Sequence, residues 1–264
     1  MQDNSATKRM TAHADQGEVI AVTDQVAVFK GDVEVVPSRS LRGDLDRHLQ
    51  VMETNYGEGG VSADDLAHRK LSKSGPRFCL PGLKGDEFVD ELVGFIMHTQ
   101  KTRALWPDSE AAGNSRPLCK SDDGIRGEGV PSGVCKDCTL GNFGPNDEPP
   151  VCKERLFLYI WCPDTRMVIV DLSRTSIADA EKFTKHVKRF APLHQVPVKI
   201  SATIVKRGMK EFSKAVFQVI GDPLSGEDAR AAAAFSARLK QLLKSSVELS
   251  TTEVLAAAID GEEV

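Results

Sequence analysis

RLFLYIWC (Arg155–Cys162) and RMVIVDLS (Arg166–Ser173) are the stretches of sequence that decide the fold. Both are rich in β-branched and aromatic residues, and the Pro163-Asp164-Thr165 segment between them has the composition of a tight turn. They therefore predict a β-hairpin. Strand alternation places two apolar sets on opposite faces of its first strand, Phe157, Tyr159 and Trp161 on one and Leu156, Leu158 and Ile160 on the other.

Further elements are expected on both sides of this hairpin. Residues 87–106 predict one long or two short strands, with a helical turn over 87–93 as the alternative. A helix follows the hairpin, with Ser176 as its expected N-cap and an apolar stripe at helical spacing, formed by Ile177, Ala180, Phe183, Val187 and Phe190. Two strands over 196–208 and 211–221 and a helix over 225–246 complete the pattern.

This order of elements predicts a mainly β chain with helices, of the α+β class. Five or so strands with a helix before the last two fit an OB-like small Greek-key barrel, which here carries a four-cysteine zinc loop and is followed by a C-terminal helix. The expected organisation is a weakly structured region 1–75, an OB-like domain 76–221 with the zinc-loop insertion 107–152, and a C-terminal helix with an acidic tail over 222–264.

The composition is that of a globular protein, with 41% hydrophobic and 27% charged residues in a chain of 264. No apolar run approaches the ~20 residues of a membrane span, and the polar N-terminus lacks an apolar signal-peptide core. We therefore expect a cytoplasmic protein without a membrane partner. In that compartment the six cysteines are expected as metal ligands or free thiols rather than disulfides.

The charge is unevenly distributed. The whole chain has a formal net charge of −4, yet residues 153–214 hold thirteen Lys and Arg against six Asp and Glu. A basic middle can bind a polyanion locally while the whole chain stays acidic, although a solvated Lys-rich helix and hairpin explain the same numbers.

Four cysteines lie in the segment 107–152, which has no hydrophobic pattern of its own. Cys119, Cys135, Cys138 and Cys152 follow a C-x15-C-x2-C-x13-C spacing. A tight Cys-x2-Cys turn bracketed by two further thiols is typical of a structural Zn²⁺ site, which would order a loop that lacks a core.

Three other interpretations fit the sequence of this segment less well. A redox Cys-x-x-Cys pair opens a helix, and the sequence after Cys138 begins a helix poorly. A deaminase-type zinc needs His-x-Glu, whereas Gln100 follows His98 here. Three carboxylates, Asp122, Asp123 and Glu128, could hold Mg²⁺ in a nuclease, but a polar turn beside the cysteines is preferred. No catalytic motif is present, so we expect no enzyme.

Cations alternate with aromatic residues in several segments, as single-strand binding requires: cations follow the phosphates and flat rings stack on bases. The same aromatic rings could instead be core. The candidate DNA-binding residues are Lys101, Arg103, Trp106, Lys153, Arg155, Phe157, Tyr159, Trp161, Lys206, Arg207, Lys210 and Lys214.

A four-ligand zinc loop inside a small barrel, basic and aromatic strands and an acidic C-terminal tail resemble the zinc-containing single-stranded-DNA-binding proteins of bacteriophages, of the T-even helix-destabilising type. The stretches GFIMHTQKTRALW, PLCKSDDG, GVCKDC and CKERLFLYI also resemble phage- and mobile-element-encoded proteins generally. The resemblance is architectural and covers about residues 88–220. Those proteins use one His and three Cys at closer spacing, whereas this chain offers four Cys.

The resemblance implies non-sequence-specific binding of single-stranded DNA in replication or recombination, inside a bacterial host cell. It also implies that the acidic tail, with Asp260, Glu262 and Glu263, docks replication or recombination proteins or inhibits the chain itself, although a solvated terminus is the preferred explanation of only three acids. The alternative function is a zinc-stabilised protein-interaction or regulatory factor without catalytic activity.

Overall fold

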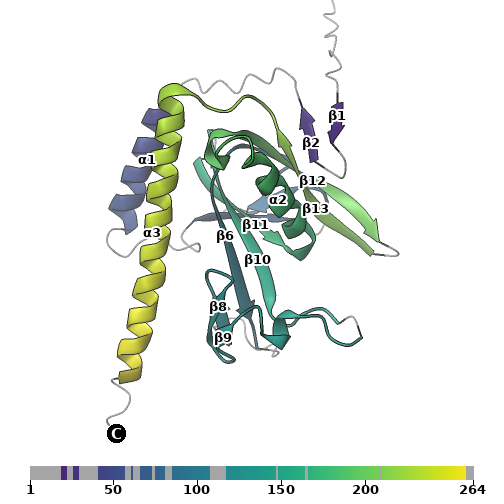
Figure 1. The fold of residues 1–264 in the computed structure, drawn as a ribbon, viewed down its shortest axis with the longest axis vertical. Helices are drawn as coiled ribbons and strands as arrows, with labels where there is room; N and C mark the ends of the chain where they lie inside the picture. Colours follow the sequence, from purple (N-terminus) through teal and green to yellow (C-terminus); the bar gives the residue numbers. More distant parts are fainter. Residues whose placement is uncertain are drawn as a thin grey trace, which may run out of the picture.

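The fold is that of a computed structural model (Figure 1). It describes residues 19–22, 26–29, 41–56, 61, 66–72, 75–80, 85–107, 117–146, 148–163, 166–207 and 210–259. The strands are β1 Val19–Val22, β2 Val26–Phe29, β3 Ala67–Leu71, β4 Phe78–Leu80, β5 Glu87–Val89, β6 Glu91–Leu105, β7 Cys119–Ser121, β8 Arg126–Gly129, β9 Gly133–Val134, β10 Lys153–Cys162, β11 Arg166–Ser173, β12 Pro197–Arg207 and β13 Lys210–Val219. The helices are α1 Leu41–Tyr56, α2 Arg174–Val187 and α3 Gly226–Ile259, with 3-10 turns η3 Thr139–Gly141 and η4 Leu193–Gln195.

The predicted hairpin lies in the middle of the sheet. Strands β10 and β11 pair antiparallel from Arg155 opposite Ser173 to Cys162 opposite Arg166. The sheet order is β1-β2-β13-β12-β6-β10-β11-β3-β4-β5, and β7, β8 and β9 branch from the lower half of β6. The expected strands over 196–208 and 211–221 are confirmed as β12 and β13, and 87–106 forms β5 and β6 rather than a helical turn.

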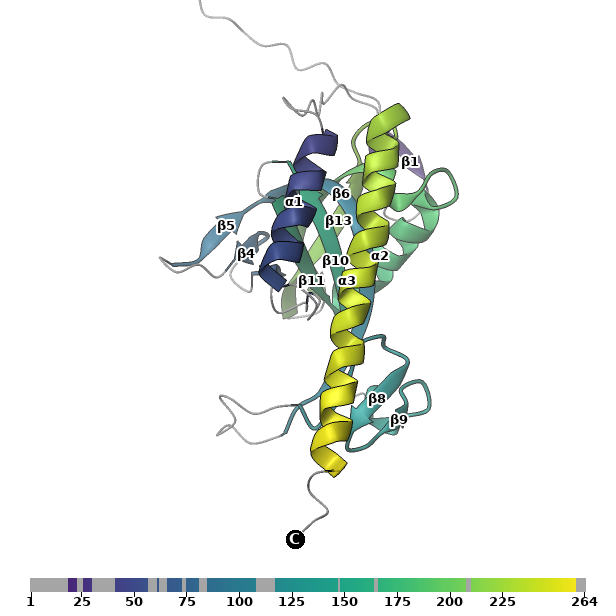
Figure 2. The ribbon, with the colours of Figure 1, turned by 90° about the vertical axis from the view of Figure 1, so that its left-hand side faces the viewer.

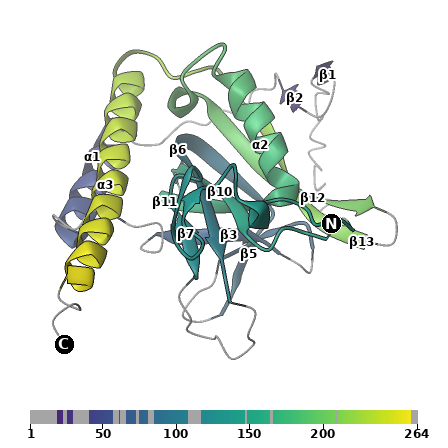
Figure 3. The same ribbon diagram turned by 60° about the horizontal axis from the view of Figure 1, so that its bottom comes forward.

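The two faces of β10 belong to two hydrophobic cores. Leu156, Leu158 and Ile160 pack against α2, whose Phe183 is fully buried. On the opposite face, Tyr159 and Trp161 pack under α1 and α3. Figure 3 shows the strands between α2 on one side and the α1–α3 pair on the other, and Figure 2 shows that pair in front of the sheet. A strand buried on both faces explains why RLFLYIWC is apolar nearly throughout.

The helix after the hairpin begins earlier than expected. Its N-cap is Ser173, not Ser176, and the buried Ser176 Oγ instead accepts a hydrogen bond of 3.0 Å from the backbone N–H of Ala215. The first four residues of the predicted stripe are buried as expected. Phe190 lies beyond Val187, the last helical residue, and is 77% exposed, because the turn after the helix does not continue its buried stripe.

The chain is mixed α and β and mostly sheet, but the sheet is open. No described residue of β1 pairs with β5, so the expected OB-like small Greek-key barrel is not confirmed. In a closed barrel β11 would pair with β13, whereas here β3 pairs parallel with β11. The Ser213 hydroxyl of β13 then donates to the carbonyl oxygens of Ser72 and Gly75, at 2.9 and 3.0 Å, just beyond β3. Side-chain contacts therefore bridge the gap that strand pairing leaves.

Part of the expected weakly structured region 1–75 contributes to the core. Leu41, Leu45 and Met52 of α1 are at most 2% exposed and face α3 and the sheet. Helix α3 continues to Ile259, well past the expected end at 246. The acidic tail, with Asp260, Glu262 and Glu263, lies outside the described residues.

Candidate nucleic-acid interface and cysteine pocket

The four predicted metal ligands come together. Cys119, Cys135, Cys138 and Cys152 all line one small pocket that is partly open to solvent. Cys119 begins β7, Cys135 follows β9, Cys138 precedes η3 and Cys152 immediately precedes β10. The pocket therefore brings residues near both ends of the long β6–β10 connection next to each other.

Glycines let the thiols approach one another. A Cβ on Gly127 would lie 2.8 Å from the Cys119 Sγ and 3.7 Å from the Cys135 Sγ. Both thiols therefore occupy the space that a side chain at this position would need. Burial raises the pKa of the Cys119 thiol, and the neighbouring Cys135 and Cys138 raise it further. Burial also raises the pKa of Cys152, while the cation of Arg103 opposes that shift.

A zinc loop is not confirmed by this geometry. Within the described parts of the chain, no group of three or more His, Cys, Asp or Glu side chains is placed so that it could hold a metal ion. Four thiolates around Zn²⁺ need bonds of about 2.3 Å, so the sulfurs would have to move closer together. The convergence of all four cysteines on one pocket is nevertheless the arrangement from which such a site would form.

Arg103 belongs to the pocket rather than to an open surface. Its Nη1 donates to the carbonyl oxygen of Cys135 at 3.3 Å and its Nη2 to Glu154 Oε1 at 3.1 Å. A Cβ on Gly141 would lie 2.7 Å from Nη1, so the guanidinium packs directly on that glycine. Arg103 thus joins β6 to the cysteine loop, and it was predicted to contact DNA because sequence spacing does not show which loop lies over it.

The carboxylates beside Cys119 form a turn. Asp123 Oδ1 accepts hydrogen bonds from the backbone N–H groups of Ile125 and Arg126 and from the Ser121 hydroxyl. Burial alone would raise the pKa of Asp123, but these hydrogen bonds outweigh it and lower the pKa. Asp122 pairs with Lys120 at 3.0 Å. These partners favour the polar-turn interpretation over a magnesium site.

Below the helices, side chains from five strands share one face of the sheet, which we call the outer face. Side chains of directly paired residues on neighbouring strands point to the same face, so each set of paired residues forms one row across the sheet. Ala104 lies opposite both Lys153 and Lys120, and Thr102 lies opposite Arg155. The next row crosses four strands and consists of Gln100, Phe157, Asp171 and Lys70.

The outer face carries cations beside partly buried aromatic surface. Lys70, Lys120 and Lys153 are exposed, and the Arg155 side chain is 37% exposed. Arg155 makes a bidentate ion pair with Asp171, whose side chain is 3% exposed. Phe157 is half-buried at the helix-covered end of the face, where His68 packs edge-on at 5.3 Å. Trp106 follows the last residue of β6 and is 51% exposed.

Two predicted stacking residues are core residues. Tyr159 is 0% and Trp161 3% exposed, because α1 and α3 cover this part of β10. The Tyr159 hydroxyl donates to Gln100 Oε1 at 2.5 Å, and Gln100 Nε2 donates to the Asp122 carbonyl at 2.8 Å. The expectation that Tyr159 and Trp161 offer open rings to bases is therefore wrong, and Gln100 links the core to the cysteine loop.

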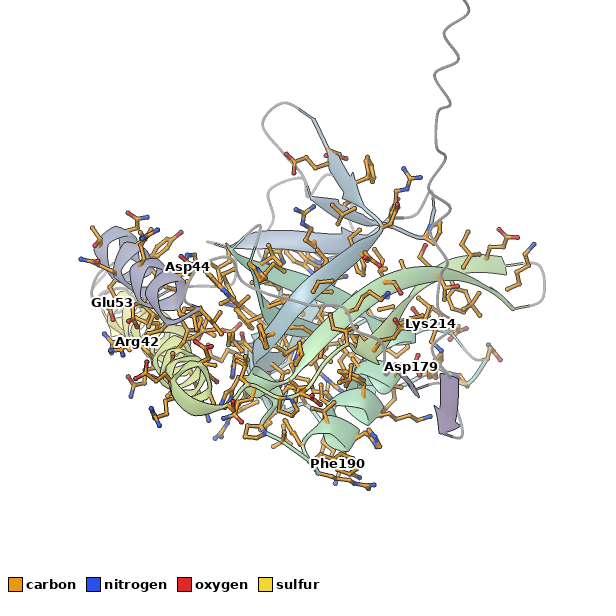
Figure 4. The ribbon with its side chains drawn as sticks, turned by 90° about the horizontal axis from the view of Figure 1, so that it is seen from above. Arg42, Asp44, Glu53, Asp179, Phe190 and Lys214 are labelled. Atoms are coloured by element: carbon orange, nitrogen blue, oxygen red, sulfur yellow. The ribbon has the colours of Figure 1, made fainter. Side chains whose placement is uncertain are left out.

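Three of the remaining predicted cations lie elsewhere and are ion-paired. Lys101 contacts Glu181 of α2 at 2.5 Å, and this hydrogen bond is the main reason that its pKa is raised. Lys206 pairs with Glu211 at 2.6 Å. Figure 4 shows Lys214 facing Asp179, with the ion pair measuring 2.6 Å. Arg207 and Lys210 lie in β12 and β13 at the tip of their hairpin, but their side chains are outside the description.

Sequence reasoning missed two cations of the outer face. Lys120 follows the first pocket cysteine, and its position is apparent once β7 is known to pair with β6. Lys70 comes from β3, a short strand that pairs parallel with β11 across almost a hundred residues of sequence, and its segment carries no periodic signal.

Comparison with family models, with curated proteins and with solved structures gives no match. The arrangement of side chains therefore carries the functional argument. Among the described helices, none combines the length and the apolar character that crossing a bilayer requires.

Proposed function

We propose that the chain binds single-stranded DNA without sequence specificity through the outer face, and that it acts as a binding protein rather than an enzyme in DNA replication or recombination. The observation that carries the proposal is the register of β7, β6, β10, β11 and β3. It supports a surface on which Phe157 and Lys70 share one row, Arg155 lies in the next row, and Lys153 and Lys120 lie in the row beyond, with Trp106 at its margin. Cations for phosphates and rings for bases are the chemistry that such binding needs.

Strand connectivity supports the same proposal by analogy. The order β6, β10, β11, α2, β12, β13, with β6 paired to both β10 and β12, is comparable to the plan of a partly open OB barrel and supports the analogy. OB folds bind oligonucleotides on the face of their second and third strands, flanked by the loops after the first and fourth strands. In this chain the corresponding loops are the cysteine segment and the tip of the β12–β13 hairpin. Fold analogy alone does not establish function, so the side chains of the outer face carry more weight.

A structural zinc ion held by Cys119, Cys135, Cys138 and Cys152 is part of the proposal. It would order the β6–β10 connection, whose strands β7, β8 and β9 are at most four residues long and bury little apolar surface. Bound as thiolates, the four cysteines would place negative charge beside Arg103, which already lines the pocket. The chain's own contribution is the glycine-lined space, and the metal would supply folding energy.

The test is binding of fluorescent oligo-dT at several salt concentrations by protein of measured zinc content. We expect tight binding that weakens with salt, with duplex bound less well. Lys153→Ala removes one phosphate partner and should lower the slope of log affinity against log salt by about 0.7. The matched control is Arg47→Ala on α1, away from the outer face, where the side chain is 70% exposed and the slope should not change. Binding of duplex and single strands with equal affinity, or of neither, would refute the proposal.

A second candidate function is a protein-interaction factor whose basic strands are incidental. The ion pairs of Lys101, Arg103, Lys206 and Lys214 favour it, because paired cations are less available to phosphates. It predicts full zinc occupancy with no affinity for oligo-dT and a stoichiometric protein partner.

A further inference from the structure

Exposed apolar side chains are concentrated on the cysteine module, which we define as residues 117–152. Six of the eleven large apolar residues that are exposed in the described chain belong to it, namely Leu118, Ile125, Val130, Val134, Phe143 and Val151, and they are 47 to 76% exposed. A contiguous exposed apolar surface marks a site of interaction. These six residues all fall within one short stretch of the sequence, and we take them as the apolar part of the module's surface.

The module is also acidic. Its sequence has six Asp and Glu against three Lys and Arg. Asp123, Glu128, Asp137 and Glu148 are exposed. A partner that covers this apolar surface should therefore carry positive charge around an apolar residue of its own.

The chain itself carries such a surface at the end of α2. Lys182, Lys185, Lys188 and Arg189 are all exposed and surround Phe190, which is 77% exposed. Residues 182–190 contain no acid, and no described carboxylate forms a salt bridge with these four cations. In Figure 4 Phe190 lies at the outer edge of the molecule. We call this surface the α2 end.

The two surfaces of one chain are directed to different ends of the molecule. Helix α2 begins directly after Ser173, which is paired with Arg155 beside the module, and its 14 residues carry the chain about 21 Å away. Figure 1 places β8 and β9 at the bottom of the molecule, well below α2. A contact between the module and the α2 end therefore has to join two copies.

We infer that the cysteine module of one copy docks on the α2 end of a second copy. The contact is heterologous, since each copy uses a different surface, and such contacts repeat into open chains unless the rotation closes a ring. Apolar residues of the module would cover Phe190, and its acids would face the four cations. Self-association does not depend on DNA. Its use in cooperative coating of a single strand rests on the proposed function.

Two variants test the contact in the absence of DNA. Val130→Glu changes a module residue that is 76% exposed, and Phe190→Glu changes the α2 end, so neither should disturb the fold. Sedimentation velocity at low salt should show wild-type species that grow with concentration, whereas each variant alone stays monomeric. Mixed together, the variants should form a one-to-one dimer and nothing larger, because one intact module then meets one intact α2 end. The control is Val51→Glu on α1, 42% exposed and outside both surfaces, which should behave as wild type.

A monomeric wild type, variants that associate like wild type, or a mixture that stays monomeric would each overturn the inference. On long oligo-dT both variants should lose cooperativity and keep wild-type affinity for an oligonucleotide that holds a single copy. Weakened binding of that short oligonucleotide by Phe190→Glu would show that the α2 end contacts DNA, which also overturns it. Association in the expected pattern by a protein without DNA affinity would support the inference while the proposed function failed.

Discussion

The two tryptophans of the chain should respond in opposite ways to substitution by alanine. Trp161 is 3% exposed and packs against both His48 and Phe235, with ring centroids 5.1 and 6.0 Å away. Removing about 200 Å² of buried apolar surface at about 25 cal/mol per Å² gives a loss near 5 kcal/mol, at the upper end of the about 3–5 kcal/mol typical for such truncations. Trp106 is 51% exposed, and its truncation should lower the free energy of unfolding by about 1 kcal/mol.

DNA binding should show the reverse order. If a base stacks on Trp106, Trp106→Ala costs about 1–3 kcal/mol of binding free energy, or about 5- to 150-fold in affinity. Urea unfolding measures the first quantity and anisotropy of labelled oligo-dT the second. The variant Trp161→Phe keeps an aromatic core residue and leaves Trp106 as the single indole, whose emission should be accessible to iodide and quenched by DNA.

A result that contradicts this reasoning is easily recognised. If Trp106→Ala binds oligo-dT as the wild type does, the outer face does not stack bases at this margin. If Trp161→Ala unfolds at the wild-type urea concentration, the α1–α3 pair does not cover β10 as described.

Three further predictions concern the pocket, the protonation of a histidine and the core. Gly127→Ala should abolish zinc binding although all four thiols remain, because the new Cβ would lie 2.8 Å from Cys119 Sγ. The control is Gly43→Ala on α1, whose Cβ would have no atom within 4 Å, and metal analysis should find about one zinc per chain in this variant. Burial, and then the cations of Lys240 and Lys188, lower the pKa of His98 from 6.5 to about 4. The folded protein therefore favours the neutral imidazole. Its contribution to stability is complete above pH 6.5 and is lost as the pH falls toward 4, because the unfolded chain binds the proton first. Between pH 7 and 5 the loss is about 2 kcal/mol in urea unfolding, and His98→Gln should remove it. Ser176→Ala leaves the buried N–H of Ala215 without its acceptor and should cost about 1–3 kcal/mol in the same assay; an unchanged midpoint would contradict that role.

The hairpin and the later strands could be predicted because their sequence signals are local. Between Arg155 and Ser173 the alternation, the β-branched residues and the turn all indicate the same structure. The grouping of the four cysteines could also be predicted, since a segment without apolar periodicity needs another source of order.

The sequence could not predict which elements cover each face of β10. Both faces of β10 are apolar, so alternation separates Tyr159 from Leu158 without showing which face meets helices and which meets solvent. The answer depends on α1, a largely polar helix with three buried residues, and on α3, which begins almost two hundred residues after the start of α1. The start of α2 was misplaced for a simpler reason: Ser173 and Ser176 are one turn apart and both suit an N-cap.

The second core has a consequence for the order of events during synthesis. Its sheet residues, such as Trp161, leave the ribosome well before Phe235 of α3, which packs on them. At 5–20 residues per second, the 74 residues from Cys162 to Phe235 take roughly 4–15 s to translate. For that interval the nascent chain displays an aromatic sheet face that α1 alone cannot close. A ribosome-bound chain halted near residue 221 should therefore be a better substrate for chaperones than the finished protein.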